Sequence, residues 1–218
     1  MIRTGDVIHN SITGETIRFV ETAADSDGER VVIDVLVEPN GFVASAHLHP
    51  YQTEVFEVVE GELTFKLGRA TVTAMAGESV TVEPGMAHKF WNATETAARF
   101  RCVISPALQF EKLLETMFGL ANDGKTNKKG LPNPLRLAVI ANHHFDDVRL
   151  PFPPASIQKL GLVFGSPTGR VLGNRHGYVA AETADVSLAI SSAPPADTRL
   201  KPDTRPRVFG FSRFQTRA

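Results

Sequence analysis

Short runs in which hydrophobic and polar residues alternate recur over the first half of the chain. The run ETIRFVE at 15–21 alternates as a half-buried strand does, and VVIDVLV at 31–37 is rich in β-branched residues. Residues 1–14 are polar and turn-rich, and we expect them to lie on the surface or to form an edge strand. Turn signals separate further runs, which predict strands at 44–49, 52–59, 62–67, 70–74, 79–82, 87–92 and 97–104. Many short strands separated by turns are typical of a β-sandwich or a β-barrel.

The pattern changes to a helical period after Ser105. Ser105-Pro106 is a standard helix start, with serine as the N-cap and proline at the first helical position, and ALQFEKLLETMFGL carries an apolar stripe that predicts packing against the barrel. A second helix is expected to begin at Asn133-Pro134 and to include LRLAVIANHH. A third apolar stretch, SIQKLGLVFGSPTGRVL, is interrupted by Ser166-Pro167 and is too short to span a bilayer. We expect this stretch to pack in the core, to form a dimer contact, or to lie over the barrel mouth.

These patterns divide the chain into three parts. Residues 1–105 are predicted to form a mainly β domain, and residues 106–173 a helical extension packed on it. Residues 174–218 lose periodicity and become rich in proline and arginine, which predicts an irregular, flexible tail.

Composition narrows the class of protein. The 218 residues are 42% hydrophobic and 22% charged, as in soluble globular proteins. A net charge of −1 gives no general attraction to polyanions, which argues against nucleic-acid binding. The N-terminus shows no apolar signal segment, and no run reaches the ~18 apolar residues of a spanning helix. The one cysteine, Cys102, excludes an internal disulfide and suits a reducing compartment. We therefore expect a cytoplasmic protein that binds neither nucleic acid nor membrane.

Three histidines and one glutamate have a spacing that indicates metal binding. His47 and His49 are separated by one residue, so on a strand their side chains share a face. Glu54 begins the next apolar run after a turn at 49–51, and a hairpin-like return would bring its carboxylate beside both imidazoles. His88 follows a glycine-rich turn further along the chain. Three imidazoles and one carboxylate favour a divalent transition metal over calcium or magnesium.

The same stretch resembles the cupin family. The first cupin signature, glycine-x5-His-x-His-x4-Glu-x6-glycine, is matched by Gly41, His47, His49, Glu54 and Gly61. The second signature, glycine-x5-Pro-x-glycine-x2-His-x3-Asn, is matched by Gly77, Gly85, His88 and Asn92. The family's proline is Glu83 here, with Pro84 one residue later, which alters a turn and leaves the ligand spacing intact. The resemblance selects a jelly-roll (cupin) β-barrel followed by a C-terminal α-helical extension. In addition, FGLANDGKTNKKGLPNPLRLAV resembles a segment after the barrel in a group of bacterial cupins with no assigned reaction.

The resemblance implies one divalent metal, which is iron, manganese, nickel, copper or zinc in different family members. We favour iron(II) or manganese(II), because mixed nitrogen and oxygen octahedral sites accommodate both, and nickel, zinc and copper remain open. Four protein ligands leave an octahedral ion two positions for water, dioxygen or the paired oxygens of a substrate. Cupins generally pair through their sheets, so a homodimer is expected.

Strand alternation predicts the lining of a substrate pocket. If Glu54 faces inward, Gln52 and Phe56 do so as well, and Phe90 shares the face of His88. We expect Phe56 and Phe90 to form an apolar wall beside the metal, with Gln52 as a polar substrate contact. Glu54 is the candidate catalytic residue, because a carboxylate can shift between metal ligand and proton acceptor.

Other reactive side chains receive structural interpretations. Arg99 and Arg101 are expected to face solvent, Cys102 to be a small buried hydrophobic residue, and Asn92 to hold backbone. A cluster near 143–147 suggests a second metal site, but it lies at a predicted helix end, where histidines commonly act as caps. We interpret it as a cap; its members are His143, His144, Asp146 and Asp147.

Taken together, these features predict a small-molecule metalloenzyme of dioxygenase type, acting on a substrate that chelates the metal through two oxygens. One alternative is a metal-dependent isomerase or cyclase, in which the metal stabilises an enediolate and no oxidant is needed. Another is a cupin that binds a metabolite through its metal without catalysing a reaction.

Overall fold

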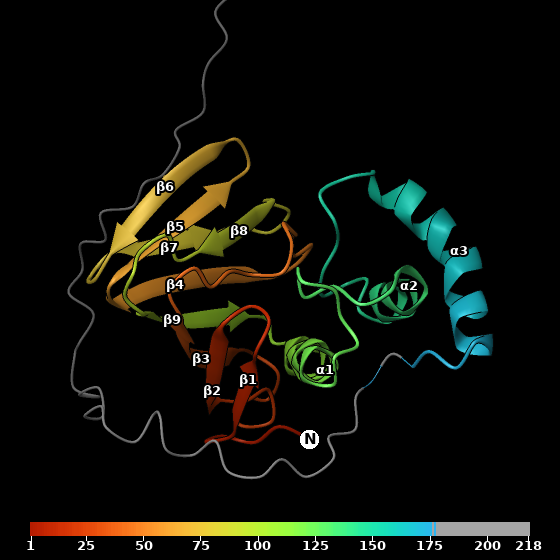
Figure 1. Cartoon of the computed structure of the whole chain (residues 1–218), viewed down its shortest axis with the longest axis horizontal. Coiled ribbons are helices and arrows are strands. Elements are labelled where there is room, and N and C mark those ends of the chain that lie inside the picture. Colours follow the sequence, from red (N-terminus) through yellow and green to blue (C-terminus); the bar gives the residue numbers. More distant parts are fainter. Residues whose placement is uncertain (176, 178–218) are drawn as a thin grey trace, which may run out of the picture.

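The computed structural model describes residues 1–175 and residue 177 (Figure 1). The predicted tail at 174–218 lies outside the described residues at position 176 and from position 178 onward. Strands come first and helices follow: β1 Val7–Asn10, β2 Glu15–Glu21, β3 Val31–Val37, β4 Thr53–Glu60, β5 Glu62–Leu67, β6 Ala70–Met75, β7 Ser79–Val82, β8 His88–Trp91, β9 Ala98–Ser105, α1 Phe110–Asn122, α2 Pro134–His143 and α3 Ala155–Val171. No helix among these is long and apolar enough to cross a membrane.

The strands form two antiparallel sheets that pack together as a jelly roll, as the sequence predicts. One sheet has the order β1-β2-β3-β9-β4-β7 and the other the order β6-β5-β8 (Figure 1). Every second residue of β3 and β9 is buried, so one face of each strand lies in the core. Four phenylalanines meet in the core, with ring centroids 5.2 Å apart for Phe56 and Phe65 and also for Phe90 and Phe100. The inner faces of both sheets therefore form the hydrophobic core.

The strand predicted at 44–49 is instead an extended segment held by single bridges. Two bridges join this part of the chain to β8, one between Phe42 and Trp91 and the other between His47 and His88. A third bridge joins Leu48 to Arg149, which follows α2. Because successive residues pair with different parts of the chain, no continuous ladder forms.

The predicted helix start at Ser105-Pro106 is wrong. Ser105 is the last residue of β9, where it pairs with Thr53, and its hydroxyl donates to the Glu29 carbonyl at 2.9 Å. It is therefore already engaged in the sheet, and α1 begins at Phe110 with Gln109 as its N-cap. The apolar stripe of α1 packs on the barrel as predicted, with Phe110 and Phe118 part of the core.

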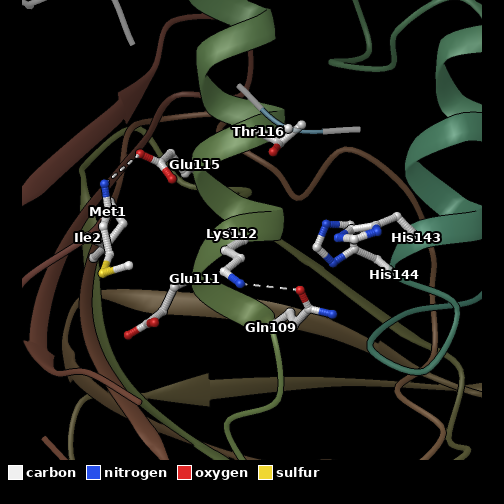
Figure 2. A pocket seen from close by; sticks show the side chains of 10 residues that line it. Met1, Ile2, Gln109, Glu111, Lys112, Glu115, Thr116, His143 and His144 are labelled. Atoms are coloured by element: carbon white, nitrogen blue, oxygen red, sulfur yellow. Dashed lines mark hydrogen bonds and ion pairs between the residues drawn. The ribbon is translucent and has the colours of Figure 1, made fainter. Parts of the chain in front are cut away.

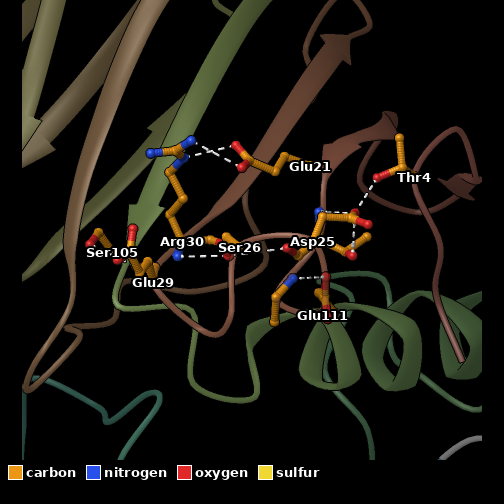
Figure 3. A network of polar contacts seen from close by, with 10 residues as sticks. Thr4, Glu21, Asp25, Ser26, Glu29, Arg30, Ser105 and Glu111 are labelled. Carbon is orange, nitrogen blue, oxygen red and sulfur yellow. Dashed lines mark hydrogen bonds and ion pairs between the residues drawn. The ribbon is translucent and has the colours of Figure 1, made fainter.

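Helix α1 is fastened to the barrel near both of its ends. In the turn between β2 and β3, the Ala23 N–H donates to the Glu111 carboxylate at 2.9 Å. This bond is part of the polar network in Figure 3. At the other end, the Asn122 side chain donates to the His9 carbonyl on β1 at 2.7 Å. The start of the extension is thus a fixed part of the barrel surface.

Helix α2 begins at Pro134 as predicted, and the Asn133 side chain accepts from the Arg136 N–H at 3.0 Å. Helix α3 runs through Pro167, so the predicted interruption at Ser166-Pro167 is wrong. Glycines bring α3 very close to α2: a Cβ added to Gly169 would lie 2.7 Å from the Leu135 carbonyl oxygen. This packing stabilises the helix despite the hydrogen bond that proline removes. In Figure 1, α2 lies between α3 and the barrel, so α3 does not cover the strands.

Candidate metal centre

The four predicted metal-binding side chains come together at one end of the barrel. His47 and His49 lie on the extended segment, Glu54 lies on β4, and His88 is the first residue of β8. Their ligand atoms all lie within 4.8 Å of one another. His49, Glu54 and His88 are buried, with exposed fractions of 2%, 4% and 2%, whereas His47 is half-buried.

Backbone pairing sets this arrangement. His47 donates its N–H to the His88 carbonyl at 3.0 Å, and His88 returns a bond of 2.8 Å to the His47 carbonyl. The Gly85 N–H donates to the His49 carbonyl at 2.8 Å. Gly85 has a φ of 79°, which glycine adopts without strain, so the turn before β8 can reach the ligand segment. Two ligands far apart in sequence are therefore held in register.

The three imidazoles share one hydrogen-bonding pattern, in which Nδ1 faces a backbone carbonyl. A carbonyl only accepts, so each Nδ1 carries the proton, and each Nε2 is left unprotonated with a lone pair for a metal. The pairs are His47 with Ser45 at 2.9 Å, His49 with Asp147 at 2.6 Å and His88 with Met86 at 3.2 Å.

Two further polar atoms of the centre lack a hydrogen-bond partner within the described part of the chain. The His49 Nε2 and Glu54 Oε2 atoms are buried without a hydrogen bond. Glu54 Oε2 lies 2.8 Å from His88 Nε2 and 3.6 Å from His49 Nε2, and two lone pairs at such distances repel unless a cation lies between them. With bonds near 2.1 Å, ligand atoms on opposite sides of an ion are about 4.2 Å apart, and the four ligand atoms here lie within 4.8 Å of one another. The centre therefore fits a divalent transition metal.

The electrostatics of the cluster hold two of the ligands, Glu54 and His47, in the protonation states that a metal needs. Burial alone would raise the pKa of Glu54, but the neighbouring histidines outweigh it and hold the pKa at about 2. Burial, aided by the charges of His88 and His49, lowers the pKa of His47 to about 3. At neutral pH, Glu54 is thus an anion and His47 a neutral imidazole.

The part of the chain that contains all four ligands matches the model of a known protein family. Residues 33–104 match the family model described as the cupin domain. The barrel of this chain is a cupin domain. The matched region ends before α1, so the resemblance of the extension to that of other bacterial cupins stays a prediction.

Three solved structures are similar to part of this chain. A protein with a double-stranded β-helix domain from Klebsiella pneumoniae is 22% identical, covers 50% of this chain and 84% of its own, and has a TM-score of 0.38. A sugar phosphate isomerase from Silicibacter pomeroyi is 20% identical over 46% of this chain and 70% of its own, with a TM-score of 0.41. A predicted oxalate decarboxylase from Thermotoga maritima is 19% identical over 49% of this chain and 98% of its own, with a TM-score of 0.42. No curated protein matches the chain. These likenesses concern the fold and carry nothing about the reaction.

The predicted alternation along β4 and β8 of this cupin is confirmed. Gln52, Glu54 and Phe56 are buried, and Phe90 is buried on the face of His88. The Phe56 ring centroid lies 6.3 Å from that of His88 and 6.1 Å from that of Phe90. The two phenylalanines thus form an apolar wall beside the ligands, and their contact with a substrate stays a prediction.

Sequence reasoning missed one aromatic neighbour of the centre. Phe110, the first residue of α1, has its ring centroid 5.9 Å from that of His49. Its apolar spacing on the helix predicts burial, but nothing in the sequence indicates which barrel residue it covers.

Gln52 has a structural role beside the predicted substrate contact. Its amide nitrogen donates to the Pro106 carbonyl at 2.9 Å and to the Ala107 carbonyl at 3.1 Å, which ties the segment after β9 to β4. Its Oε1 atom is buried and has no hydrogen-bond partner among the described residues. The polar contact with a substrate stays a prediction.

The structural interpretations of the other reactive side chains are confirmed. Asn92 donates to the Val37, Glu38 and Thr96 carbonyls. Arg101, on the solvent side of β9, pairs with Asp34 at 2.7 Å. Cys102 is buried, and burial together with the charge of Glu54 raises the pKa of its thiol well above the usual range.

The cluster at 143–147 forms a helix cap, as interpreted, and the described residues contain no second metal-binding group there. His144 is the C-cap residue of α2, and its Nδ1 lies 2.9 Å from the Asp147 carboxylate. The other oxygen of that carboxylate accepts from the Gln109 N–H at 2.7 Å.

A cavity of about 390 Å³ lies beside this cap, between the N-terminus, α1 and the end of α2 (Figure 2). Gln109 and His144 are among the residues that line it. None of the four metal-binding side chains does so, and the cavity is therefore separate from the metal centre.

Proposed function

We propose that this cupin is a divalent-metal-dependent enzyme of dioxygenase type, acting on a small substrate that chelates the metal through two oxygens. The observation that carries the proposal is the buried set of three imidazoles and one carboxylate, with every Nδ1 bonded to a carbonyl and ligand atoms within 4.8 Å. A site preorganised in this way with four protein ligands leaves two positions of an octahedral ion for reactants.

When bound, the metal supplies a Lewis acid and a common site for dioxygen and substrate. Iron(II) and manganese(II) are the ions that we favour, because both accept mixed nitrogen and oxygen ligands. The protein supplies the rest: Glu54 stays ionised, and Phe56 and Phe90 keep bulk water away from the ligands.

The surroundings of the ligands also support a chelating, partly apolar substrate. Three ligands are buried and His47 is half-buried, so a substrate is expected to approach past His47. Phe56 and Phe90 suit the apolar part of such a molecule. In this proposal Glu54 would hold the metal and accept a proton from the substrate, and Gln52 Oε1, which has no partner among the described residues, would accept a hydrogen bond.

Metal content is the first test. Protein purified without added metal is expected to contain close to one transition-metal ion per chain by elemental analysis, and the His49→Ala variant to contain little. The matched control is His9→Ala, which removes a half-buried histidine on β1 that bonds Thr16 far from the centre. Metal retained in His49→Ala would contradict the proposed site.

Oxygen consumption tests the reaction. Metal-loaded protein is expected to consume dioxygen with a chelating diketone or catechol, and metal-free protein to consume none. A substrate rearranged without oxygen uptake would replace the dioxygenase by the isomerase or cyclase. Binding without turnover would favour a metabolite-binding cupin.

A further inference from the structure

The segment that carries His47 and His49 is bonded along both of its edges. On one edge, His47 exchanges backbone hydrogen bonds with His88 of β8. On the other edge, Leu48 and Arg149 donate to each other's carbonyls, both at 2.9 Å. The second edge belongs to the loop after α2, outside the part of the chain that matches the cupin family model.

The same loop contacts a metal ligand directly. The His49 Nδ1 donates to the Asp147 backbone carbonyl at 2.6 Å, the shortest of the three histidine–carbonyl distances in the centre. For His47 and His88, the accepting carbonyl lies two residues before the histidine itself, so only His49 depends on a distant segment. Removing this acceptor would free the ring to rotate and to present either nitrogen to the metal.

Three other polar atoms of Asp147 are bonded, and they fix the position of its carbonyl. The Asp147 N–H donates to the His144 carbonyl at 3.0 Å. One carboxylate oxygen lies 2.9 Å from His144 Nδ1, and the other accepts from the Gln109 N–H at 2.7 Å. The His144 and Asp147 residues are 1% and 3% exposed, so water does not compete for these bonds. The end of α2, the start of α1 and the ligand His49 therefore meet at one residue.

We propose that Asp147 is a positioning residue of the metal centre, and that the helical extension is thereby part of the site rather than an attachment to the barrel. This inference rests on the proposed metal-dependent function. Hydrogen-bond partners of metal-ligating histidines contribute about 10- to 100-fold to metal affinity, which sets the size of the expected effect. Coupling between two sites is reciprocal, so metal binding must in turn stabilise the segment 144–149.

The first test compares Asp147→Ala with Asp146→Ala, using cobalt(II) as the probe. Asp146 is a neighbouring carboxylate whose side chain is 74% exposed and which pairs with Arg149, so its loss leaves the link to His49 in place. Asp147→Ala keeps the backbone carbonyl but loses both side-chain bonds that position it, so we expect it to weaken cobalt binding by about 10-fold, the lower end of that range, and to change the visible absorption spectrum of the bound ion. Asp146→Ala is expected to match the wild-type chain in both.

The conservative variant Asp147→Asn separates positioning from loss of folding. Its amide keeps an oxygen for the Gln109 N–H and a nitrogen that can donate to His144 Nδ1. We expect it to restore most of the affinity and the wild-type spectrum. Wild-type affinity and spectrum in Asp147→Ala would overturn the inference.

The second test uses the wild-type chain, so it stands even if a variant fails to fold. Cobalt(II) is expected to slow amide hydrogen exchange at Leu48 and Arg149, and to leave strand β6, which is remote from the ligands, unchanged. Unchanged exchange at Arg149 on cobalt binding would overturn the inference while leaving the metal centre intact. Failure of the wild-type chain to bind cobalt(II) would instead remove the proposed function itself.

Discussion

The imidazole of His49 donates a hydrogen bond to the backbone carbonyl of Asp147, which lies 98 positions away in the sequence. This bond joins the cupin barrel to the helical extension at the metal centre. Because the carbonyl fixes Nδ1 as the protonated nitrogen, the extension decides which nitrogen of His49 faces the other ligands.

Glu54→Gln is expected to weaken binding of a divalent metal by more than 100-fold, because it removes the one anionic ligand and leaves a buried amide among three imidazoles. Isothermal titration with cobalt(II) measures the change. Glu57→Gln is the matched control, since Glu57 lies on the exposed face of the same strand. Equal losses in both variants would contradict a specific role for Glu54.

Metal affinity is expected to fall as the pH decreases from 8 to 6. Burial lowers the pKa of His88, but the Glu54 carboxylate, which accepts a hydrogen bond from Nε2 once that nitrogen is protonated, outweighs burial, so the pKa lies above its usual 6.5. The metal requires the neutral imidazole, so a proton competes with it below that pKa and affinity is lost as the pH falls. Cobalt(II) titrations at half-unit steps measure this dependence, and a constant affinity over the range would contradict it.

Glu15→Gln is expected to stabilise the protein at pH 8 and to have little effect at pH 4. Burial, only partly offset by the nearby Thr13 side chain, raises the pKa of Glu15 from 4.5 to about 7. Stability associated with the protonated carboxyl is therefore complete below pH 4.5 and is lost as the pH rises to about 7, a loss of about 3 kcal/mol.

Urea unfolding of the metal-free protein at both pH values measures the effect of Glu15→Gln. Glu38→Gln, at an exposed position after β3, is the control and is expected to show no such dependence. A gain of equal size at pH 4 and pH 8 would exclude titration of Glu15 as its cause.

Gln52→Leu is expected to lower the free energy of unfolding by about 1–3 kcal/mol, because the Pro106 and Ala107 carbonyls lose their donor. Chemical denaturation of the metal-free protein measures the loss. An unchanged stability with a raised KM for substrate would show that Gln52 acts in the pocket and not as a tie between β4 and the extension.

Two glycines of α3 are expected to respond oppositely to alanine. A Cβ at Gly169 would lie 2.7 Å from the Leu135 carbonyl oxygen and from the Val139 side chain, so Gly169→Ala should destabilise the α2–α3 packing by about 1–3 kcal/mol. A Cβ at Gly161 meets nothing within 4 Å, so Gly161→Ala should be neutral or stabilise by up to about 1 kcal/mol. Thermal unfolding followed by circular dichroism distinguishes them, and equal effects would contradict the packing.

The sequence predicts the barrel well because its signals are local. Strands β2 and β3 fall where alternating and β-branched residues predict them, and the ligand spacing identifies the four side chains that the fold brings together. The helix start predicted at Ser105 is wrong because Ser105 pairs in the sheet with Thr53, which is distant in sequence. A local N-cap pattern does not reveal that pairing. Likewise, the alternation of residues that predicts Gln52 as inward-facing carries no information about the carbonyls it bonds.

The bridge between Leu48 and Arg149 also bears on how cupin sequences are compared. A chain cut after Ser105 would keep all four ligand residues and every matched signature position. It would nevertheless lose the second edge of the ligand segment, the acceptor for His49 and the aromatic ring of Phe110 beside it. If Asp147 positions His49 as proposed, the ligand residues and the segment that orients one of them are encoded in different halves of the chain.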